Sequence, residues 1–251
     1  MTVVAVLGLG EAGGRIAADL VAAGATVRGY DPFAAGTPEG VACAASAREA
    51  VAGADLILSL SSAGAALGAA TEAAAALGDG AVYADLNTAS PELKRELAAR
   101  TPRFADVALL GPVPARGFAT PALASGPAAA AFAALAGPLG MPVEVVSANP
   151  GDAAALKLVR SVFMKGVAAA AIETLDAAEA IGSRAWAERQ LAEVIGESVL
   201  ARFVEGSRRH AERRAHEMDD ACTLLESLGV EPRIAAASRA LLVKLAEEGP
   251  V

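Results

Sequence analysis

The sequence predicts an α/β protein in which a doubly wound parallel sheet is followed by an all-helical C-terminal domain. An apolar strand, a glycine-rich turn, a helix and a second strand follow one another within the first 31 residues. Short apolar runs then alternate with alanine-rich helical segments as far as residue 150, as expected for a parallel sheet covered by helices. Beyond that point the strand pattern stops. We therefore expect two domains, residues 1–150 and 151–251, with a cleft between them.

The glycine-rich turn has the G-x-G-x-x-G spacing of a Rossmann-type dinucleotide-binding domain. Gly8 is expected to make the tight turn, Gly10 to let a pyrophosphate approach the backbone, and Gly13 to let the helix pack closely on the strand. The diphosphate would then lie on the unpaired N–H groups at the positive end of the helix. A Rossmann-like unit that has lost its nucleotide is the alternative. The predicted phosphate-binding turn consists of Gly8, Leu9, Gly10, Glu11, Ala12 and Gly13.

The second strand, residues 26–30, is followed directly by Asp31, which lies 18 residues after Gly13. An acid at this place hydrogen-bonds the adenosine ribose in such folds. A carboxylate also repels the 2′-phosphate of NADP, so Asp31 favours NAD as the cofactor, with NADP as the other possibility. The helix between the two strands stops at Gly24, which suits a C-terminal cap.

The remaining elements are expected from the apolar pattern. Ser90 is a plausible N-cap for the helix that begins at Pro91. Strands are expected at residues 55–60, 81–86, 104–109, 122–125 and 143–146, and helices at 46–51, 65–77, 91–100 and 127–136. Further helices are expected at residues 152–181, 185–205, 207–228 and 232–248.

Composition excludes several classes of function. No apolar stretch has the ~20 uninterrupted residues that a membrane span needs, and the chain begins in a strand with no visible export signal. A net charge of −8 argues against general nucleic-acid binding. The two cysteines, Cys43 and Cys222, have no metal-type spacing. We expect a cytoplasmic protein with no metal, membrane or nucleic-acid partner. The alanine-rich helical half favours a homodimer.

Together these residues resemble the β-hydroxyacid dehydrogenase superfamily, which includes 6-phosphogluconate and 3-hydroxyisobutyrate dehydrogenases. The resemblance covers nearly the whole chain. It is stronger to a poorly characterised branch of phosphogluconate-dehydrogenase-like proteins with a divergent C-terminal domain, because of Gly111-Pro112 and the C-terminal Arg/His/Glu segment. It implies an NAD(P)-dependent enzyme that transfers a hydride between nicotinamide and a small, anionic hydroxy acid.

The resemblance implies that Lys157 is the general acid or base. Lys157 follows Gly151 by six residues, as in the glycine-to-lysine element of the family. Burial there would bring the pKa of the lysine closer to neutrality. A lysine on a helix surface is the alternative. Ser161 stands where the family commonly has an asparagine that orients the substrate, and it shares the helix face of Lys157.

Two strand ends are expected to border the cofactor. The segment 85–91 resembles the family's segment beside the nicotinamide, so Asn87 and Thr88 are expected to contact the ribose or carboxamide. Turn and cap chemistry is an equally good reading of these two residues. Leu60, Ser61 and Ser62 follow the preceding strand and would border the cofactor from the other side.

The substrate loop is where the chain departs from the family. The family's Asp-x-Pro-Val-Ser-Gly-Gly aligns with residues 106–112, and Leu110 replaces the serine that would bind a substrate carboxylate. Gly111 remains and is followed by Pro112; both are predicted substrate contacts. The substrate is therefore expected not to be 3-hydroxyisobutyrate and to carry a larger or more apolar group.

A second polar segment, residues 208–218, is rich in arginine, which suits carboxylates and phosphates. Its members at three- and four-residue spacing are expected on one helix face that binds an anionic substrate. A solvated helix with internal Arg–Glu pairs is the alternative. The predicted residues of this face are His210, Arg213, Arg214 and Glu217. Lys165, eight residues after Lys157 on the same helix, is a further candidate that would face the cleft obliquely, and a structural or surface role is its alternative.

Two rival functions remain open at this stage. An imine-reductase-like C=N reductase has the same two-domain plan, but such relatives usually replace the catalytic lysine, so Lys157 favours alcohol or carbonyl chemistry. A non-catalytic NAD-binding sensor is compatible with Ser161 and Leu110.

Overall fold

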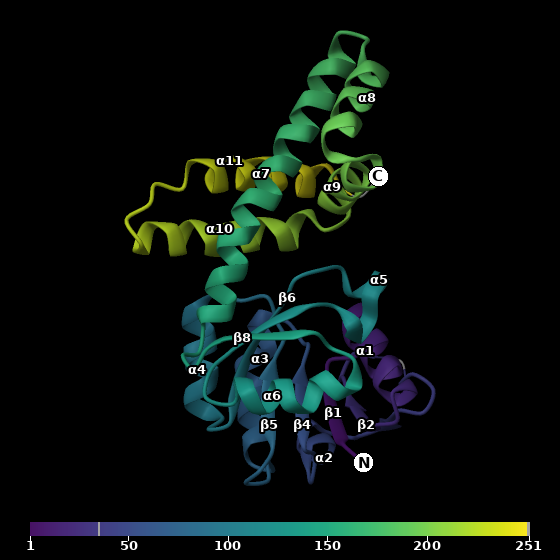
Figure 1. Cartoon of the computed structure of the whole chain (residues 1–251), viewed down its shortest axis with the longest axis vertical. Coiled ribbons are helices and arrows are strands. Elements are labelled where there is room, and N and C mark those ends of the chain that lie inside the picture. Colours follow the sequence, from purple (N-terminus) through teal and green to yellow (C-terminus); the bar gives the residue numbers. More distant parts are fainter. Residues whose placement is uncertain (35, 250–251) are drawn as a thin grey trace. The chain divides into compact units, whose positions relative to one another are not determined.

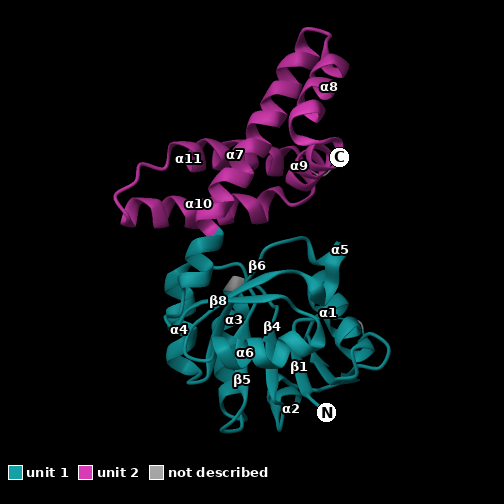
Figure 2. Ribbon diagram, in the orientation of Figure 1, with its two compact units in different colours: residues 1–157 teal, residues 158–251 magenta. Residues whose placement is uncertain are grey.

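The computed structural model describes residues 1–34 and 36–249. The chain divides into two compact units, Met1–Lys157 and Leu158–Val251, which Figure 2 shows in different colours. Within the described residues no helix is both long enough and apolar enough to span a membrane.

The first unit contains one eight-stranded sheet, as the alternating pattern predicts. The strand order is β3-β2-β1-β4-β5-β6-β7-β8, so the chain winds outwards in both directions from β1. All neighbouring strands pair in parallel except β6 and β7. The strands are β1 (Val3–Leu7), β2 (Thr26–Tyr30), β3 (Ala42–Cys43), β4 (Leu56–Ser59), β5 (Val82–Asp85), β6 (Phe104–Leu109), β7 (Ala122–Ser125) and β8 (Val143–Ser147).

Two details of the sheet differ from the sequence prediction. The two-residue strand β3 was not predicted, because its length is too short for an apolar pattern. Strand β7 runs antiparallel to β6. The connection between them holds only α5 (Val113–Arg116) and the turn Gly117–Ala119, and no crossover helix returns the chain to the other end of the sheet, as a parallel strand requires.

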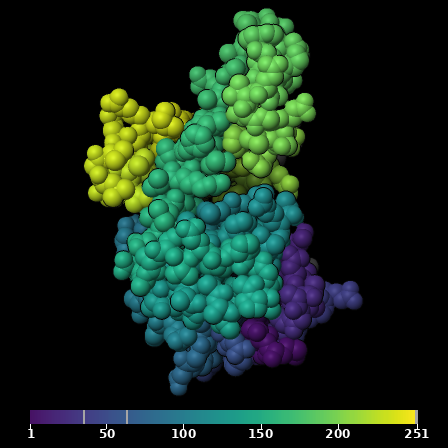
Figure 3. Space-filling model, viewed as in Figure 1, coloured from purple at the N-terminus to yellow at the C-terminus, as the bar shows by residue number. Residues whose placement is uncertain are grey.

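Helices cover both faces of the sheet. Helices α1 (Glu11–Ala22) and α6 (Ala129–Ala136) pack on one face, where α6 is seen in front of the strands in Figure 1. Side chains of the segment that includes α6 and β8 cover much of this face in the space-filling view of Figure 3. Helices α2 (Ala47–Val51), α3 (Ala63–Ala74) and α4 (Pro91–Arg100) pack on the opposite face.

Helices make up the second unit. Helix α7 (Asp152–Ala180) has 29 residues, of which the first six belong to the first unit. Its later turns pack on α8 (Arg184–Ile195) and α9 (Glu197–Arg209) and on the paired helices α10 (Ala211–Ser227) and α11 (Arg233–Glu248). The long helix predicted for residues 152–181 is confirmed.

The predicted helices 185–205 and 207–228 were wrong in their boundaries. The first is broken at Gly196, whose φ of +86° ends α8 and starts α9. The second begins later, because His210, with φ −124° and ψ 30°, separates α9 from α10. An alanine-rich pattern hides such breaks, since alanine fits every position of a helix.

Candidate functional site

The glycine-rich turn is tightly packed at two positions and open at the third. A Cβ on Gly8 would lie 2.5 Å from the Leu60 carbonyl oxygen, and one on Gly13 would lie 1.9 Å from the carbonyl oxygen of Gly8. Gly8 also has a φ of +96°, which L-residues rarely adopt. Among the described residues, no atom lies within 4 Å of a Cβ built on Gly10. The turn therefore fits the three roles expected from its spacing.

The start of α1 has the features of an anion site. Gly10 is the N-cap of α1, and no side chain caps that end with a hydrogen bond in the part of the chain described. The first-turn N–H groups, beginning at Glu11 and Ala12, carry the positive end of the helix dipole. With the open space at Gly10, these residues fit the diphosphate of a dinucleotide.

Asp31 lies at the end of β2 and is fixed beside the turn. Its Oδ2 accepts a hydrogen bond from the Leu9 N–H at 2.8 Å, and its Oδ1 accepts one from the Phe33 N–H at 2.9 Å. Arg28 is turned to the backbone of α2, where its Nη1 donates to the Glu49 carbonyl at 3.4 Å. The carboxylate is thus the charged group of β2 that the structure orients towards the glycine turn.

The strand ends predicted to border the cofactor differ in exposure. Leu60 is half-buried against the glycine turn, whereas Ser61 and Ser62 are exposed. Ser62 Oγ accepts a hydrogen bond from the Ala65 N–H and so caps α3. Asn87 is buried, and its amide nitrogen donates to Asp85 and to Ser59. Ser62 is therefore a helix cap, whereas Asn87 is held by two buried side chains.

Lys157 lies against the segment that follows β5. Its Nζ donates a hydrogen bond to Thr88 Oγ1 at 2.9 Å, and the side chain is half-buried. The start of α7 is held close by, because a Cβ on Gly151 would lie 2.8 Å from the Pro91 carbonyl oxygen. The structure therefore brings together Lys157 and Thr88, which are 69 residues apart in the sequence.

A buried triad, Lys94, Asp85 and Asp106, lies beneath this contact and was missed by the sequence analysis. Lys94 Nζ is 2.6 Å from Asp85 Oδ1 and 3.2 Å from Asp106 Oδ1, and the three side chains are at most 1% exposed. Burial alone would lower the pKa of Lys94, but the two carboxylates outweigh it and the pKa stands above its ordinary value. The charged residues around Lys94 on α4 are exposed, so the sequence pattern gives no sign of its burial.

The triad continues into the first turn of α7. Asp106 Oδ2 accepts hydrogen bonds from Ser125 Oγ at 3.1 Å and from the Ala154 N–H at 2.9 Å. Ser125 Oγ in turn accepts the Ala153 N–H at 3.0 Å. Two N–H groups that would otherwise be unpaired at the helix start are thereby satisfied.

A second-unit cluster consists of Ser161, Lys165 and Glu217. Glu217 Oε1 accepts hydrogen bonds from Ser161 Oγ at 2.5 Å and from Lys165 Nζ at 2.7 Å. Ser161 and Glu217 are buried, and the Lys165 side chain is 16% exposed. Burial lowers the pKa of Lys165; Glu217 raises it, but Arg214 and Arg213 lower it further. The Ser161 hydroxyl is thus held within the cluster.

The arginine-rich face is only partly as predicted. Arg214 lies beside the second-unit cluster and donates to Ser207 Oγ at 2.8 Å, and burial lowers its pKa. Arg213 is exposed. The expectation that His210 shares this helix face was wrong, because His210 stands between α9 and α10 and outside the regular helix.

The predicted substrate loop is tied to α1. Pro112 is exposed at the start of α5, and Gly111 is half-buried. The Phe118 N–H donates to Asp19 Oδ2 at 2.9 Å, and a Cβ on Gly117 would collide with that carboxylate. The helix that starts at the glycine turn therefore also anchors the loop that follows β6.

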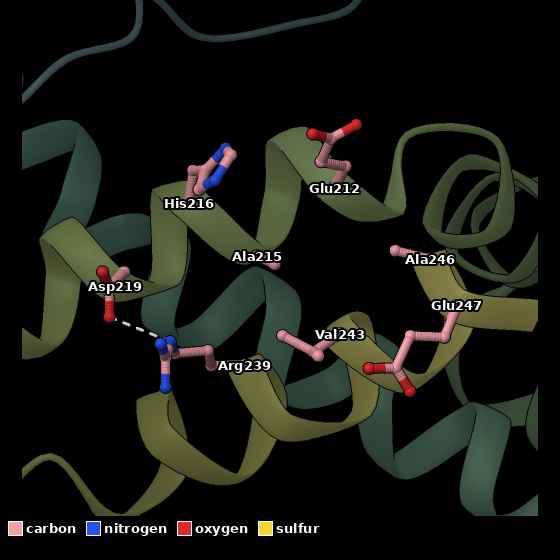
Figure 4. Close-up of a pocket in the computed structure, with 8 residues that line it drawn as sticks. All are labelled: Glu212, Ala215, His216, Asp219, Arg239, Val243, Ala246 and Glu247. Atoms are coloured by element: carbon pink, nitrogen blue, oxygen red, sulfur yellow. Dashed lines mark ion pairs between the residues drawn. The ribbon is translucent and has the colours of Figure 1, made fainter.

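A groove of about 380 Å³ lies between α10 and α11 in the second unit. Figure 4 shows Arg239 reaching from α11 to Asp219 on α10, where the ion pair is 2.9 Å long. Acidic side chains outnumber basic ones in this groove, so it does not suit an anionic substrate. None of the predicted site residues lines it, the lining residues being Glu212, Ala215, His216, Asp219, Arg239, Val243, Ala246 and Glu247.

Two family models match separate segments of the chain. Residues 3–114 match the NAD binding domain of 6-phosphogluconate dehydrogenase, and residues 178–245 match a domain of unknown function. An uncharacterized 28.5 kDa protein of Methanothermus fervidus is 28% identical over 160 residues, which are 60% of this chain. The chain spans 61% of the length of that curated relative.

Solved structures match over almost the whole chain. A conserved hypothetical protein from Sinorhizobium meliloti is 31% identical, with a TM-score of 0.75 over 97% of this chain and 88% of its own. A conserved protein of unknown function, described as structurally similar to 3-hydroxyacid dehydrogenases, is 29% identical, with a TM-score of 0.74 over 98% and 97% of the two chains. The 3-hydroxyisobutyrate dehydrogenase of Mycobacterium tuberculosis is 23% identical, with a TM-score of 0.80 over 98% and 94%.

More distant proteins of the same fold bind nicotinamide cofactors. They include an imine reductase from Myxococcus stipitatus with NAD⁺, 20% identical and with a TM-score of 0.66 over 99% and 95% of the two chains. A reductive aminase from Aspergillus terreus with NADPH is 19% identical, with a TM-score of 0.67 over the same shares. The matched NAD binding domain agrees with the fit of the glycine turn to a dinucleotide.

Proposed function

Since the chain belongs to the β-hydroxyacid dehydrogenase superfamily, with an NAD binding domain of the 6-phosphogluconate dehydrogenase type, we propose that it oxidises or reduces a small hydroxy acid. The hydride is exchanged with a nicotinamide cofactor. The observation that carries this proposal is the contact between Lys157 and Thr88, which holds an amine beside the end of β5 in the nucleotide-binding unit.

Lys157 moves the proton in the proposed reaction. When bound, the nicotinamide supplies a two-electron acceptor or donor. Lys157 Nζ takes the proton from the substrate hydroxyl during oxidation and returns it to the carbonyl oxygen during reduction. Thr88 orients the amine by accepting its hydrogen bond. The glycine turn and the start of α1 hold the diphosphate.

Asp31 supports NAD as the preferred cofactor. Its carboxylate is fixed by two backbone N–H groups, so a 2′-phosphate would meet a negative charge that does not move aside easily. We expect separate fluorescence titrations to show that NADH binds more tightly than NADPH. Asp31→Asn should reduce the difference between the two dissociation constants. Tighter binding of NADPH to the wild-type chain would contradict this assignment.

The positive charges of the second unit support an anionic substrate. Arg213 and Arg214 lie close enough to Lys165 to lower its pKa, although burial lowers it most. Leu110, in place of a serine, supports a substrate with an additional apolar group. We also propose Gly111 and Pro112 as substrate contacts in the first unit, and Ser161 and Glu217 as substrate contacts in the second.

A screen of small hydroxy acids with NAD tests the proposed function. Lys157→Met should lower kcat by about 10²–10⁴-fold, the usual contribution of a general acid or base. Lys244→Met is the matched control, because Lys244 is a lysine whose side chain is 65% exposed on α11. Its kcat should equal that of the wild type.

Two outcomes would overturn the proposal in different ways. Turnover of cyclic imines, with no turnover of any hydroxy acid, would identify a C=N reductase. Tight NAD binding without turnover of any substrate would identify a non-catalytic NAD sensor.

A further inference from the structure

We propose that Lys94 is a positioning residue that fixes both partners of the Lys157–Thr88 contact through Asp85 and Asp106. The role rests on the proposed function only in its kinetic consequence. The contacts themselves all lie within the first unit.

One branch runs from Lys94 to Thr88. Lys94 Nζ donates to both the carbonyl oxygen and Oδ1 of Asp85, at 2.9 and 2.6 Å. Asp85 Oδ2 accepts the amide of Asn87 at 2.7 Å, and Asn87 directly precedes Thr88. The ammonium group thus fixes the carboxylate that holds the segment after β5.

The other branch runs from Lys94 to Lys157. Lys94 Nζ is 3.2 Å from Asp106 Oδ1, and Asp106 Oδ2 accepts the Ala154 N–H at 2.9 Å. Ala154 lies one turn before Lys157 on α7. The start of the lysine-bearing helix is thereby fixed to the centre of the sheet.

The strand register explains why one lysine reaches both branches. Asp85 and Asp106 are paired neighbours on β5 and β6, and each presents one oxygen to Lys94 and the other to its own branch. Two carboxylates this close repel each other unless a cation lies between them. Removing the ammonium should therefore weaken the contacts of both branches, to the segment after β5 and to the start of α7.

The two aspartates allow the branches to be separated. In Asp85→Asn, one carboxylate oxygen becomes an NH₂ group, which cannot accept a hydrogen bond. Depending on the orientation of the amide, the hydrogen bond from Asn87 or the one from Lys94 is lost. In Asp106→Asn, one oxygen must serve both Lys94 and the Ala154 N–H. Each substitution keeps the size of the side chain and should weaken one branch only.

Amide hydrogen exchange measures this without any substrate. Asp106→Asn should speed exchange at Ala153 and Ala154 by about tenfold, and Asp85→Asn should do the same within residues 86–90. Lys94→Met should speed exchange in both segments. Thr101→Val is the matched control, because Thr101 is also fully buried, at the C-terminal cap of α4, and its hydroxyl donates to the Leu97 carbonyl, away from the triad. It should speed exchange uniformly or not at all.

The kinetic consequence is a loss of kcat with an unchanged KM for NAD. Asp85→Asn and Asp106→Asn should each lower kcat by about tenfold per folded molecule, whereas Thr101→Val should leave it unchanged. The two asparagine variants carry the test if Lys94→Met does not fold.

The positioning role would be overturned if both asparagine variants changed the exchange rate by the same factor throughout the chain, as Thr101→Val does. So would variants that keep the wild-type kcat and the wild-type exchange of both segments. If the wild-type chain turns over no hydroxy acid, the proposed function fails, and the exchange pattern still decides the role of Lys94.

Discussion

The two units each bury a lysine, and the pKa values of the two ammonium groups lie on opposite sides of the ordinary value. Lys94 in the first unit has two carboxylates within 3.2 Å, and its pKa is raised. Burial lowers the pKa of Lys165 in the second unit, and the carboxylate of Glu217 does not offset it, because Arg214 and Arg213 also lie near. Burial disfavours both ammonium groups, so the count of neighbouring charges decides the outcome.

The comparison shows that burial of a lysine does not by itself indicate a catalytic amine. The triad around Lys94 is a closed electrostatic unit that fixes the protein's own backbone. The second-unit cluster carries excess positive charge from its arginines, which an anionic ligand would neutralise. In our proposals, the first arrangement positions other residues and the second binds the anionic substrate.

The largest effect is expected on removing the Lys94 ammonium. Lys94→Met should lower the free energy of unfolding by about 3–5 kcal/mol, because two buried carboxylates lose their counter-charge. Lys165→Met should cost less, about 1–3 kcal/mol, because one buried carboxylate instead of two loses its ammonium partner and Arg214 still lies near it. Urea unfolding of both variants measures the contrast. Equal losses of unfolding free energy in the two variants would contradict this prediction.

A smaller effect is expected at Glu217. Glu217→Gln removes the carboxylate that counters the surrounding cations and should cost about 1–3 kcal/mol of stability. It should also lower the pKa of Lys165 further, which ¹³Cε NMR titration of the four lysines in the sequence can follow. Glu226→Gln, at an exposed position of the same helix, is the control. An unchanged pKa of Lys165 would show that Glu217 does not set it.

The two lysines should also differ in how stability depends on alkaline pH. Lys165 has a folded pKa below its ordinary 10.5, so between these values the unfolded chain binds more protons and stability rises with pH. Lys94 has a folded pKa above 10.5, so its contribution is complete below that pH and is lost as pH rises through the folded value. In Lys165→Met, the free energy of unfolding measured from pH 8 upward should no longer show this rise with pH. The same pH dependence in both proteins would contradict it.

The smallest effect is expected at Ser161. Ser161→Ala removes one hydrogen bond to Glu217 and should cost about 0.5–1.5 kcal/mol, which thermal unfolding can measure. Because Lys165 still binds Glu217, the carboxylate keeps a charged partner. A loss as large as that of Glu217→Gln would show that the hydroxyl, and not the ammonium, holds the cluster together.

Most of the sheet could be predicted because its strands are apolar runs bounded by clear turn residues. The glycine turn and Asp31 were located by spacing alone. Strand β7 runs antiparallel for a reason that local pattern does not carry: direction depends on what the connecting segment does in space. The break at Gly196 had a local signal, since glycine commonly ends a helix, but the alanine-rich surroundings masked it.

The site was predictable where a motif carried it and not where tertiary contacts did. Lys157 was predicted from the family resemblance, through its six-residue spacing from Gly151, and Thr88 was predicted from a strand end. Lys94 could not be recognised, because its neighbours on α4 read as an ordinary solvated face. Its burial follows from Asp85 and Asp106 being adjacent in the sheet, a pairing between residues 21 positions apart in the sequence.

The scarcity and placement of lysine have a practical consequence. The chain has four lysines, and two of them, Lys94 and Lys165, are held in ion pairs inside the protein. Amine-reactive dyes, cross-linkers and resins will therefore attach mainly at Lys244, at the N-terminus and, where the reagent fits, at Lys157. Protection of Lys157 from such a reagent by added NAD would offer a direct chemical footprint of the cofactor.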